Sequence, residues 1–346
     1  YNMIVVMEPK ATEEQINRVV DYIQSKGLRV NINRGEHLTV VAVLGDKAKL
    51  SQSSINSIDG VHEVKIIQEP YKLVSRSTKE EDTVITFKNG VKIGGLERPV
   101  IMAGPCSVEK DFEGLLKVAQ AAKEMGCQFL RGGAFKPRTS PYDFQGLEEK
   151  GLQYLAQARE KTGLLVVTEI MDTMDIPLVC KYADVLQVGA RNMQNFKMLK
   201  ALGKIDKPVM IKRGAAATIR EFLLAAEYVV YNGNPNVILC ERGIKGIDND
   251  YTRNTLDIAA VPIIRKYSHL PIIVDPSHGT GKRYLIEPMG KAALIAGAHG
   301  LMIEVHHDPD HASSDGAQSL SIEQFKDVAK RLNKLIGRID YDNRNS

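Results

Sequence analysis

Between residues 99 and 307, short apolar runs alternate with longer segments that have the amphipathic spacing of helices. Segments 112–123 and 219–230 are clear examples of that helical spacing. Strands that alternate with helices of this length indicate βαβ units and a parallel sheet. The apolar runs that we interpret as strands are 100–103, 128–130, 164–167, 185–188, 209–211, 237–240, 272–274 and 301–303.

A polar or potentially metal-binding residue follows each of these runs. Those residues are Cys106, Arg131, Glu169, Arg191, Lys212, Arg242, His278 and Glu304. An open doubly wound sheet is the alternative fold, but it would seldom place such a residue at every strand exit. The pattern favours an α/β protein with a (β/α)8 TIM barrel, in which reactive groups gather at the C-terminal ends of the strands.

Residues 3–67 predict a separate unit with the order βαββαβ, which is a ferredoxin-like pattern. Residues 3–7 predict a strand, and Thr12 with Gln15 fits a capping box that opens a helix ending at Gly27. Strands at 28–32 and 38–43, a second helix and a strand at 61–67 complete the pattern. Such a unit usually binds or regulates.

The predicted domains are therefore 1–67, ferredoxin-like and regulatory; 68–82, a charge-rich linker; and 83–346, the barrel. A hairpin at 84–93 turns at Asn89-Gly90, a dipeptide that favours a type I′ turn. Since it precedes the first barrel strand, we expect it to plug the N-terminal mouth of the barrel.

Composition excludes several classes of protein. The chain has 346 residues, with 46 basic and 42 acidic residues spread along it for a net charge of +4, which argues against nucleic acid as a partner. No apolar stretch approaches the ~20 residues of a membrane span, and no signal-peptide pattern is present. We expect a cytoplasmic enzyme with no membrane partner.

Basic residues from four βα units are predicted to converge at one barrel mouth. They are Arg131, Lys136, Arg138, Arg191, Lys212 and Arg242. Guanidinium groups bind phosphate and carboxylate oxygens through paired donors, and lysine adds a compact charge. Cations gathered in this way require anions, so the set suits two phosphorylated substrates.

A second group of residues offers metal ligands. It comprises Cys106, His278, Glu304 and Asp315. A thiolate, an imidazole and two carboxylates suit a divalent ion such as Mn, Fe, Zn or Co, which could polarise an aldehyde oxygen. His306, His307 and His311 form a competing cluster, although adjacent histidines on a strand point in opposite directions.

Several motifs resemble those of the 3-deoxy-D-arabino-heptulosonate 7-phosphate (DAHP) synthases of type Iβ. The resemblance covers the whole barrel, and residues 3–67 look like the regulatory domain that some members carry. The motifs are AGPCSVE at 103–109, LRGGAFKPRTS at 130–140, VGAR at 188–191, IKRG at 211–214, CERG at 240–243, DPSH at 275–278 and IEV at 303–305.

The resemblance implies a transferase that condenses phosphoenolpyruvate with erythrose 4-phosphate, the first step of the shikimate pathway to chorismate and the aromatic amino acids. By motif, the phosphoenolpyruvate site would consist of Arg131, Lys136, Arg191, Lys212 and Arg242. Arg138 and Thr139 would bind the phosphate of erythrose 4-phosphate. The metal ligands would be Cys106, His278, Glu304 and Asp315, and no position departs from the family pattern.

The resemblance also implies roles beyond binding. We expect catalytic residues at Cys106 and His278, proton transfer near the aldehyde by Lys136, and orientation of the attacking water by Glu169. A homotetramer and allosteric inhibition by tyrosine or phenylalanine are further expectations.

Two alternative functions follow from the same residues. A 3-deoxy-D-manno-octulosonate 8-phosphate synthase has the same fold and chemistry but uses arabinose 5-phosphate; its loop typically has Lys-Ala-Asn-Arg-Ser where this chain has Lys136-Pro-Arg-Thr-Ser140. Proline there fixes the backbone, and the earlier arginine is consistent with a shorter sugar phosphate. The other alternative is a non-catalytic, amino-acid-sensing protein, which usually lacks a ligand or anchor residue; none is missing here.

Overall fold

The chain divides into two compact units, described here by a computed structural model. The first unit spans residues 1–82 with 266–269, and the second spans 83–265 with 270–346. The structure describes residues 2–35, 38–44, 50–67, 70–136, 140, 142, 144–248 and 250–339. In the region predicted as a linker, Tyr71, Leu73 and Val74 are buried. These apolar side chains are therefore covered by other residues, although the charge of the segment suggested a simple connection.

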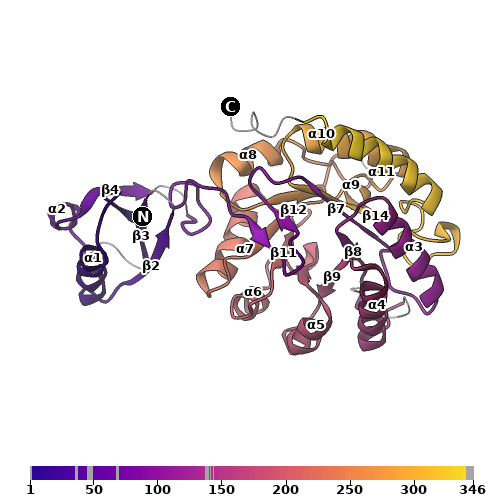
Figure 1. Ribbon diagram of the computed structural model, residues 1–346, viewed down its shortest axis with the longest axis horizontal. Helices are drawn as coiled ribbons and strands as arrows, with labels where there is room; N and C mark the ends of the chain where they lie inside the picture. Colours follow the sequence, from indigo (N-terminus) through magenta and orange to yellow (C-terminus); the bar gives the residue numbers. More distant parts are fainter. Residues whose placement is uncertain are drawn as a thin grey trace. The chain divides into compact units, whose positions relative to one another are not determined.

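The first unit contains a four-stranded antiparallel sheet in the order β2-β3-β1-β4, with helices α1 and α2 (Figure 1). The predicted capping box is confirmed: the Thr12 hydroxyl accepts from the amide of Gln15, whose side chain accepts from the Thr12 amide. The elements are β1 (Asn2–Met7), α1 (Glu13–Ser25), β2 (Arg29–Arg34), β3 (Thr39–Leu44), α2 (Gln52–Asn56) and β4 (Val61–Ile67). The ferredoxin-like pattern is therefore confirmed.

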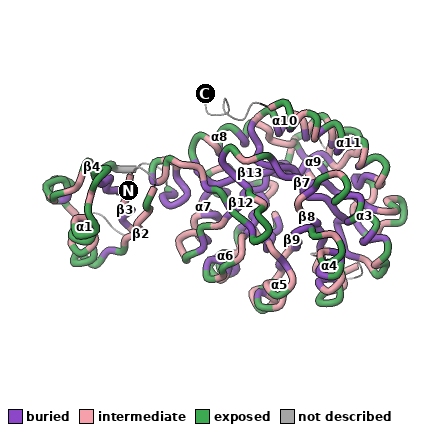
Figure 2. The backbone as a smooth tube through the Cα atoms, viewed as in Figure 1, coloured by how far each residue is buried: buried purple, intermediate pink, exposed green. Residues whose placement is uncertain are grey.

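The second unit is a closed barrel of eight parallel strands, as predicted, counted over the described residues. The strands are β7 (Val100–Gly104), β8 (Phe129–Arg131), β9 (Leu165–Ile170), β10 (Val185–Val188), β11 (Val209–Lys212), β12 (Val237–Glu241), β13 (Ile272–Val274) and β14 (Gly300–Glu304). Apolar strands of this kind are typical of parallel sheets buried on both faces. Figure 2 shows the strands as largely buried and the outer helices as partly exposed.

Helices surround the barrel on its outside (Figure 1). The α-helices are α3 (Phe112–Glu124), α4 (Glu148–Thr162), α5 (Ile176–Tyr182), α6 (Phe196–Leu202), α7 (Ile219–Tyr231), α8 (Ala260–Tyr267), α9 (Pro276–Thr280), α10 (Arg283–Ile295) and α11 (Ile322–Ile336). Short 3₁₀ turns are η2 (Thr173–Asp175), η3 (Ala190–Asn192) and η4 (Pro309–His311). Among the described residues, no helix combines the length and apolar character that crossing a membrane requires.

The hairpin before the barrel closes its N-terminal mouth, as predicted. It comprises β5 (Ile85–Thr86) and β6 (Lys92–Ile93), and Phe87 packs edge-on against Phe129 at the start of β8, with 5.1 Å between ring centroids. The predicted type I′ turn is wrong. Gly90 has a φ of +85°, but Asn89 is not among the described residues with positive φ, which type I′ also requires. The amide of Gly90 instead bonds the carbonyl of Phe87, giving a three-residue loop whose Gly90 ends the turn.

Candidate active site

Strand alternation builds the site. Successive side chains on a strand face opposite sides, so inward positions recur every second residue. Val167, Met210 and Met302 belong to the apolar interior of the barrel. Two residues further along their strands come Glu169, Lys212 and Glu304. The inward positions at this level across the barrel are Gly104, Arg131, Glu169, Gln187, Lys212, Arg242, Asp275 and Glu304.

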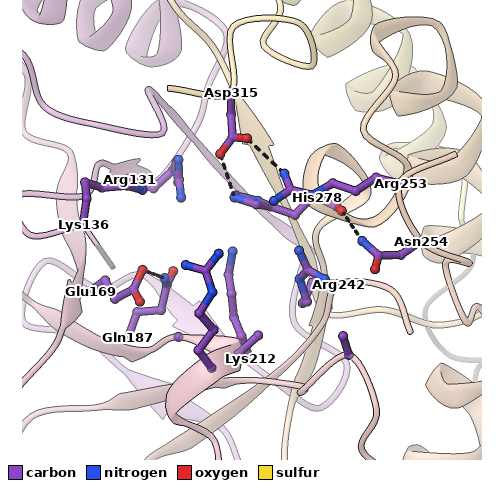
Figure 3. A pocket seen from close by; sticks show the side chains of 14 residues that line it. Arg131, Lys136, Glu169, Gln187, Lys212, Arg242, Arg253, Asn254, His278 and Asp315 are labelled. Carbon is purple, nitrogen blue, oxygen red and sulfur yellow. Dashed lines mark hydrogen bonds and ion pairs between the residues drawn. The ribbon is translucent and has the colours of Figure 1, made fainter. Parts of the chain in front are cut away.

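A cavity of about 370 Å³ opens at this level (Figure 3). Most of the residues predicted to bind substrate meet there. Its lining includes Arg131, Lys136, Glu169, Gln187, Arg191, Lys212, Arg242, Arg253, Asn254, His278 and Asp315. Arg138 and Thr139 lie outside the described residues. A polar, strongly cationic lining of this kind suits small anionic ligands.

Arg131, the last residue of β8, is fixed in a buried position. Its guanidinium donates to the carbonyl of Pro105 at 2.7 Å and pairs with Glu304 at 3.2 Å, with the side chain 5% exposed. Its Nε is buried and has no hydrogen-bond partner among the described residues. A buried donor without a partner is costly, which fits a guanidinium that completes its bonds with an anionic ligand.

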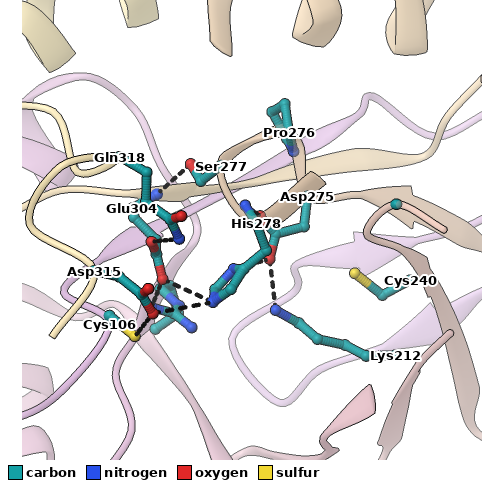
Figure 4. A network of polar contacts seen from close by, with 12 residues as sticks. Cys106, Lys212, Cys240, Asp275, Pro276, Ser277, His278, Glu304, Asp315 and Gln318 are labelled. Atoms are coloured by element: carbon teal, nitrogen blue, oxygen red, sulfur yellow. Dashed lines mark hydrogen bonds and ion pairs between the residues drawn. The ribbon is translucent and has the colours of Figure 1, made fainter. Parts of the chain in front are cut away.

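The four predicted metal ligands form one cluster. One ligand atom from each of Cys106, His278, Glu304 and Asp315 lies within 4.8 Å of the other three (Figure 4). Nε2 of His278 lies 3.0 Å from Glu304, and Sγ of Cys106 lies 3.0 Å from Asp315. Among the described residues, these four are the His, Cys, Asp and Glu side chains whose ligand atoms lie close enough together to hold a metal ion. One sulfur, one nitrogen and two carboxylate oxygens fit a divalent transition metal.

Burial and charge set the ionisation of these ligands. Burial, with a further contribution from Glu304, raises the pKa of the Cys106 thiol to about 11. Burial also lowers the pKa of His278, which favours the neutral, ligating imidazole. Burial acts to raise the pKa of Asp315, but His278, Cys106 and Arg253 bring it down to about 2. Two of the donors are therefore ready to bind at neutral pH, whereas the thiol must lose a proton.

Asp275 joins the Cys/His/Glu/Asp cluster to the cationic cavity, and no role was predicted for it from the sequence. Its carboxylate lies 2.7 Å from Nδ1 of His278 and 2.5 Å from Nζ of Lys212, and it is fully buried (Figure 4). Burial opposes its ionisation, yet His278 and Lys212 hold its pKa well below the usual range. A carboxylate on the second nitrogen of a ligating histidine fixes the ring's orientation and tautomer. The inward alternation on β13 was the available signal, since Asp275 lies two residues beyond Ile273.

Residues of the segment between β12 and α8 hold two members of the metal cluster. Arg253 donates to Asp315 at 3.0 Å, and Asn254 donates to the backbone carbonyl of His278 at 3.2 Å (Figure 3). Gln318 donates to Glu304 at 2.5 Å. These residues were missed because they follow no strand and their partners are distant in sequence.

The sequence predicted that Glu169 follows the end of its strand, but Glu169 lies inside β9. Its carboxylate accepts a 3.5 Å hydrogen bond from Gln187 on β10 (Figure 3). A Cβ atom at position 189 would collide with this carboxylate, so Gly189 makes room for it. Glu169 thus faces the cavity beside Arg131 and Lys212.

The histidines after β14 do not diverge, so that prediction was wrong. The rings of His306 and His307 stack with 4.5 Å between centroids because both residues follow the end of β14, where strand alternation no longer applies. They pair instead with Glu109 at 3.4 Å and Asp111 at 3.1 Å.

Comparison with known proteins identifies the family. The family model described as "DAHP synthetase I family" matches residues 82–339, and the "DAHP synthase ferredoxin-like domain" matches residues 3–69. The chain belongs to the DAHP synthetase I family. It is an enzyme of that family, with the family's barrel and ferredoxin-like domain.

Relatives and solved structures agree with this assignment. The chain is 51% identical to the phospho-2-dehydro-3-deoxyheptonate aldolase of Thermotoga maritima, over 96% of this chain and 97% of that protein. A crystal structure described as that aldolase (DAHP synthase) from Thermotoga maritima has a TM-score of 0.76 and 50% identity, covering 97% of this chain and 98% of the other. A 2-dehydro-3-deoxyphosphooctonate aldolase of Nitrobacter hamburgensis is 32% identical over 69% of this chain and 88% of that protein.

Proposed function

We propose that this member of the DAHP synthetase I family condenses phosphoenolpyruvate with erythrose 4-phosphate, producing DAHP and phosphate as the first step of the shikimate pathway. The observation that carries the proposal is the joint position of a cationic cavity and a Cys/His/Glu/Asp cluster. Cations would hold two phosphorylated substrates, while the cluster would hold the metal beside the reacting aldehyde.

The cations would position phosphoenolpyruvate. Arg131, Lys136, Arg191, Lys212 and Arg242 all line the cavity. Arginine offers paired donors to carboxylate and phosphate oxygens, and Lys212 is already aligned by Asp275. Arg138 and Thr139 would bind the phosphate of erythrose 4-phosphate, so that C3 of the enol faces the aldehyde carbon.

The metal ligands would be Cys106, His278, Glu304 and Asp315. When bound, a divalent metal supplies Lewis acidity that favours attack on the aldehyde. Arg253 and Asp275 would orient Asp315 and His278, which keeps two of the donors in place.

Lys136 is the proposed proton donor to the aldehyde oxygen. Its Nζ lies 3.1 Å from Sγ of Cys106 and 3.0 Å from the backbone carbonyl of Cys106, at the edge of the metal cluster. A general acid must reach the atom that it protonates, and this position meets that requirement. Full turnover by Lys136→Met at saturating substrate concentrations would contradict the role.

Glu169 is the proposed orienting group for the water that adds at C2 of the former enol before phosphate leaves. Its carboxylate faces the cavity beside the cations that would hold phosphoenolpyruvate. We expect Glu169→Gln to reduce kcat while leaving the KM for phosphoenolpyruvate within about threefold, since only water activation is lost. An unchanged kcat would contradict this role.

The direct test is phosphate release from phosphoenolpyruvate. We expect release that depends on erythrose 4-phosphate, stops with a chelator and resumes when Mn, Fe, Zn or Co is added back one at a time. Release that survives complete metal removal would contradict the metal role. Release without erythrose 4-phosphate would indicate a different reaction.

A second candidate function is 3-deoxy-D-manno-octulosonate 8-phosphate synthesis. It is supported by similarity to 2-dehydro-3-deoxyphosphooctonate aldolases at 28–32% identity, against 51% for the heptonate aldolase. The two functions are separated by kcat/KM for arabinose 5-phosphate and erythrose 4-phosphate. A higher value for the pentose would favour this second function.

We also propose that residues 1–67 form a regulatory domain for tyrosine or phenylalanine, joined by 68–82 to the catalytic barrel at 83–346, in a homotetramer. Support comes from the match of residues 3–69 to the ferredoxin-like domain of DAHP synthases. Inhibition should be measured for the full chain and for residues 83–346 alone. Equal inhibition of the two would contradict the regulatory role, and light scattering would test the tetramer.

A further inference from the structure

Two of the cavity's cations adjoin charged residues that face the opposite way. Lys212 ends β11 and is followed by Arg213, whereas Arg242 follows Glu241 at the end of β12. Lys212 and Arg242 line the cavity (Figure 3). By strand alternation, Arg213 and Glu241 face outward, between the barrel and its helices. Both belong to sequence motifs, IKRG and CERG, whose other basic residues the proposed function already uses.

Arg213 is the centre of a buried polar network on this outer side. Its side chain is 5% exposed and lies 2.9 Å from the fully buried Glu241 and 2.8 Å from Asp257. Its Nε also donates to the carbonyl of Ala217 at 2.9 Å. One guanidinium thereby joins β11, β12, the segment before α8 and the loop before α7.

The same network reaches the backbone that carries the cavity residues. The second carboxylate oxygen of Glu241 accepts a hydrogen bond from the amide of Gly243 at 2.6 Å. The side chain of Glu241, which precedes Arg242, thus binds the backbone of the residue that follows Arg242. The amide of Arg213 donates to the carbonyl of Cys240 at 3.0 Å, which extends the pairing of β11 with β12. A cavity-lining residue, Ala215, is held in the loop between Arg213 and Ala217.

Buried ion pairs contribute little net stability, since the loss of hydration offsets their attraction, and apolar replacements are often tolerated. Burial indeed raises the pKa of Glu241 against the opposing effect of Arg213. The network therefore calls for an explanation other than stability.

We propose that Arg213 is a positioning residue, which through Glu241 and Asp257 holds Lys212 and Arg242 in the geometry that binds phosphoenolpyruvate. The proposal rests on the phosphoenolpyruvate role given to these cations above. A displacement of about 1 Å can cost on the order of 100-fold in a site of this kind. Loss of Arg213 therefore weakens phosphoenolpyruvate binding more than metal binding, because the four candidate metal ligands lie on other strands.

The test uses the full-length protein loaded with Mn²⁺, a double variant, a conservative single variant and a control variant. Arg213→Met leaves Glu241 buried without its cation, so the double variant Arg213→Met/Glu241→Met removes both charges and preserves folding. Arg213→Lys keeps the charge but cannot reach all of the partners. Arg159→Met is the matched control, because Arg159 pairs with Asp184 at 3.2 Å and lies outside the cavity lining.

The readouts are the Kd for phosphoenolpyruvate by calorimetry, the KM for each substrate, Mn²⁺ affinity and the melting temperature. We expect the double variant to melt near the wild type, to bind Mn²⁺ within about twofold and to raise the Kd and KM for phosphoenolpyruvate by about 10- to 100-fold. The KM of the double variant for erythrose 4-phosphate should stay within about threefold of the wild-type value. The Kd of Arg213→Lys for phosphoenolpyruvate should lie between those of the wild type and the double variant, and the control should match the wild type.

A folded double variant whose Kd for phosphoenolpyruvate stays within about threefold of wild type overturns the proposal, as does an equal rise in both KM values. Calorimetry also separates this proposal from the proposed function. If the wild type binds phosphoenolpyruvate but releases no phosphate with erythrose 4-phosphate, the proposed function fails, and the ratio of Kd values still decides the role of Arg213. A wild type that binds no phosphoenolpyruvate refutes both.

Discussion

Replacing Asp275 by asparagine tests the link between the two halves of the site. The substitution keeps size and shape but removes the charge that lies 2.5 Å from Nζ of Lys212 and 2.7 Å from Nδ1 of His278. Lys212 is 5% exposed and would lose its close carboxylate. His278 would lose the partner that fixes its ring. We therefore expect Asp275→Asn to weaken both stability and metal binding.

The structure sets the size of each effect. Breaking a buried ion pair from one side costs about 3–5 kcal/mol, because the remaining charge stays buried. For a domain of this size that corresponds to a fall of roughly 10 °C in melting temperature. Loss of a carboxylate behind a ligating histidine typically weakens metal binding about 10- to 100-fold.

The pH dependence gives an independent check. The folded-state pKa of Asp275 lies well below its usual value, so its contribution to stability is present above the unfolded-state pKa of about 4. That contribution is lost as pH falls through the lower, folded-state pKa. The stability gap between wild type and Asp275→Asn should therefore be full near pH 7 and should narrow below about pH 4.

The assay is thermal unfolding of the metal-free protein together with a chelator-competition titration. Glu124→Gln is the control, since it removes a more exposed ion pair, between Glu124 and Lys326 at 2.6 Å, and should change stability by less than about 0.5 kcal/mol. The reasoning would be refuted by an Asp275→Asn protein that melts within about 2 °C of wild type and binds metal within about twofold.

Three further predictions concern the metal, the hairpin and the first unit. Because burial and Glu304 raise the pKa of the Cys106 thiol to about 11, metal affinity should rise about tenfold per pH unit from roughly pH 6.5 to 8.5 in a competition titration, and Cys106→Ser should abolish that slope. Gly90→Ala should cost about 1–2 kcal/mol in urea unfolding, since φ is +85° and nothing lies within 4 Å of the added Cβ; no loss would show that the turn relaxes. Thr12→Ala should cost about 1 kcal/mol by removing the capping box of α1, whereas an unchanged midpoint would show that the cap is unimportant.

Local pattern was sufficient where each element depends on its own residues. The capping box at Thr12, the apolar barrel strands and the plugging hairpin were predicted because hydrophobic spacing and capping act over a few residues. The prediction of a type I′ turn was wrong because Asn-Gly also suits a three-residue loop, in which only the glycine needs a positive φ. The prediction that the two adjacent histidines after β14 point in opposite directions was wrong, because the alternation of side chains in a strand does not extend beyond the end of that strand.

The candidate site divides in the same way. Sequence motifs and strand exits predicted the four residues that form the Cys/His/Glu/Asp cluster and the cations of the cavity lining, apart from those outside the described residues. Asp275, Arg253 and Arg213 were missed, since each acts by holding a residue distant in sequence.

The sequence by itself determined the two folds and the types of chemical group available, because hydrophobic periodicity and residue chemistry are local properties. The tertiary structure decided which groups meet. Closure of the barrel brings β7, β13 and β14 together, so that Cys106, His278 and Glu304 share one cluster although some 200 residues separate the first from the last. It also places Asp275 between His278 and Lys212, and Arg213 behind the cations. Those contacts depend on strand register and closure, which no single segment of the chain contains.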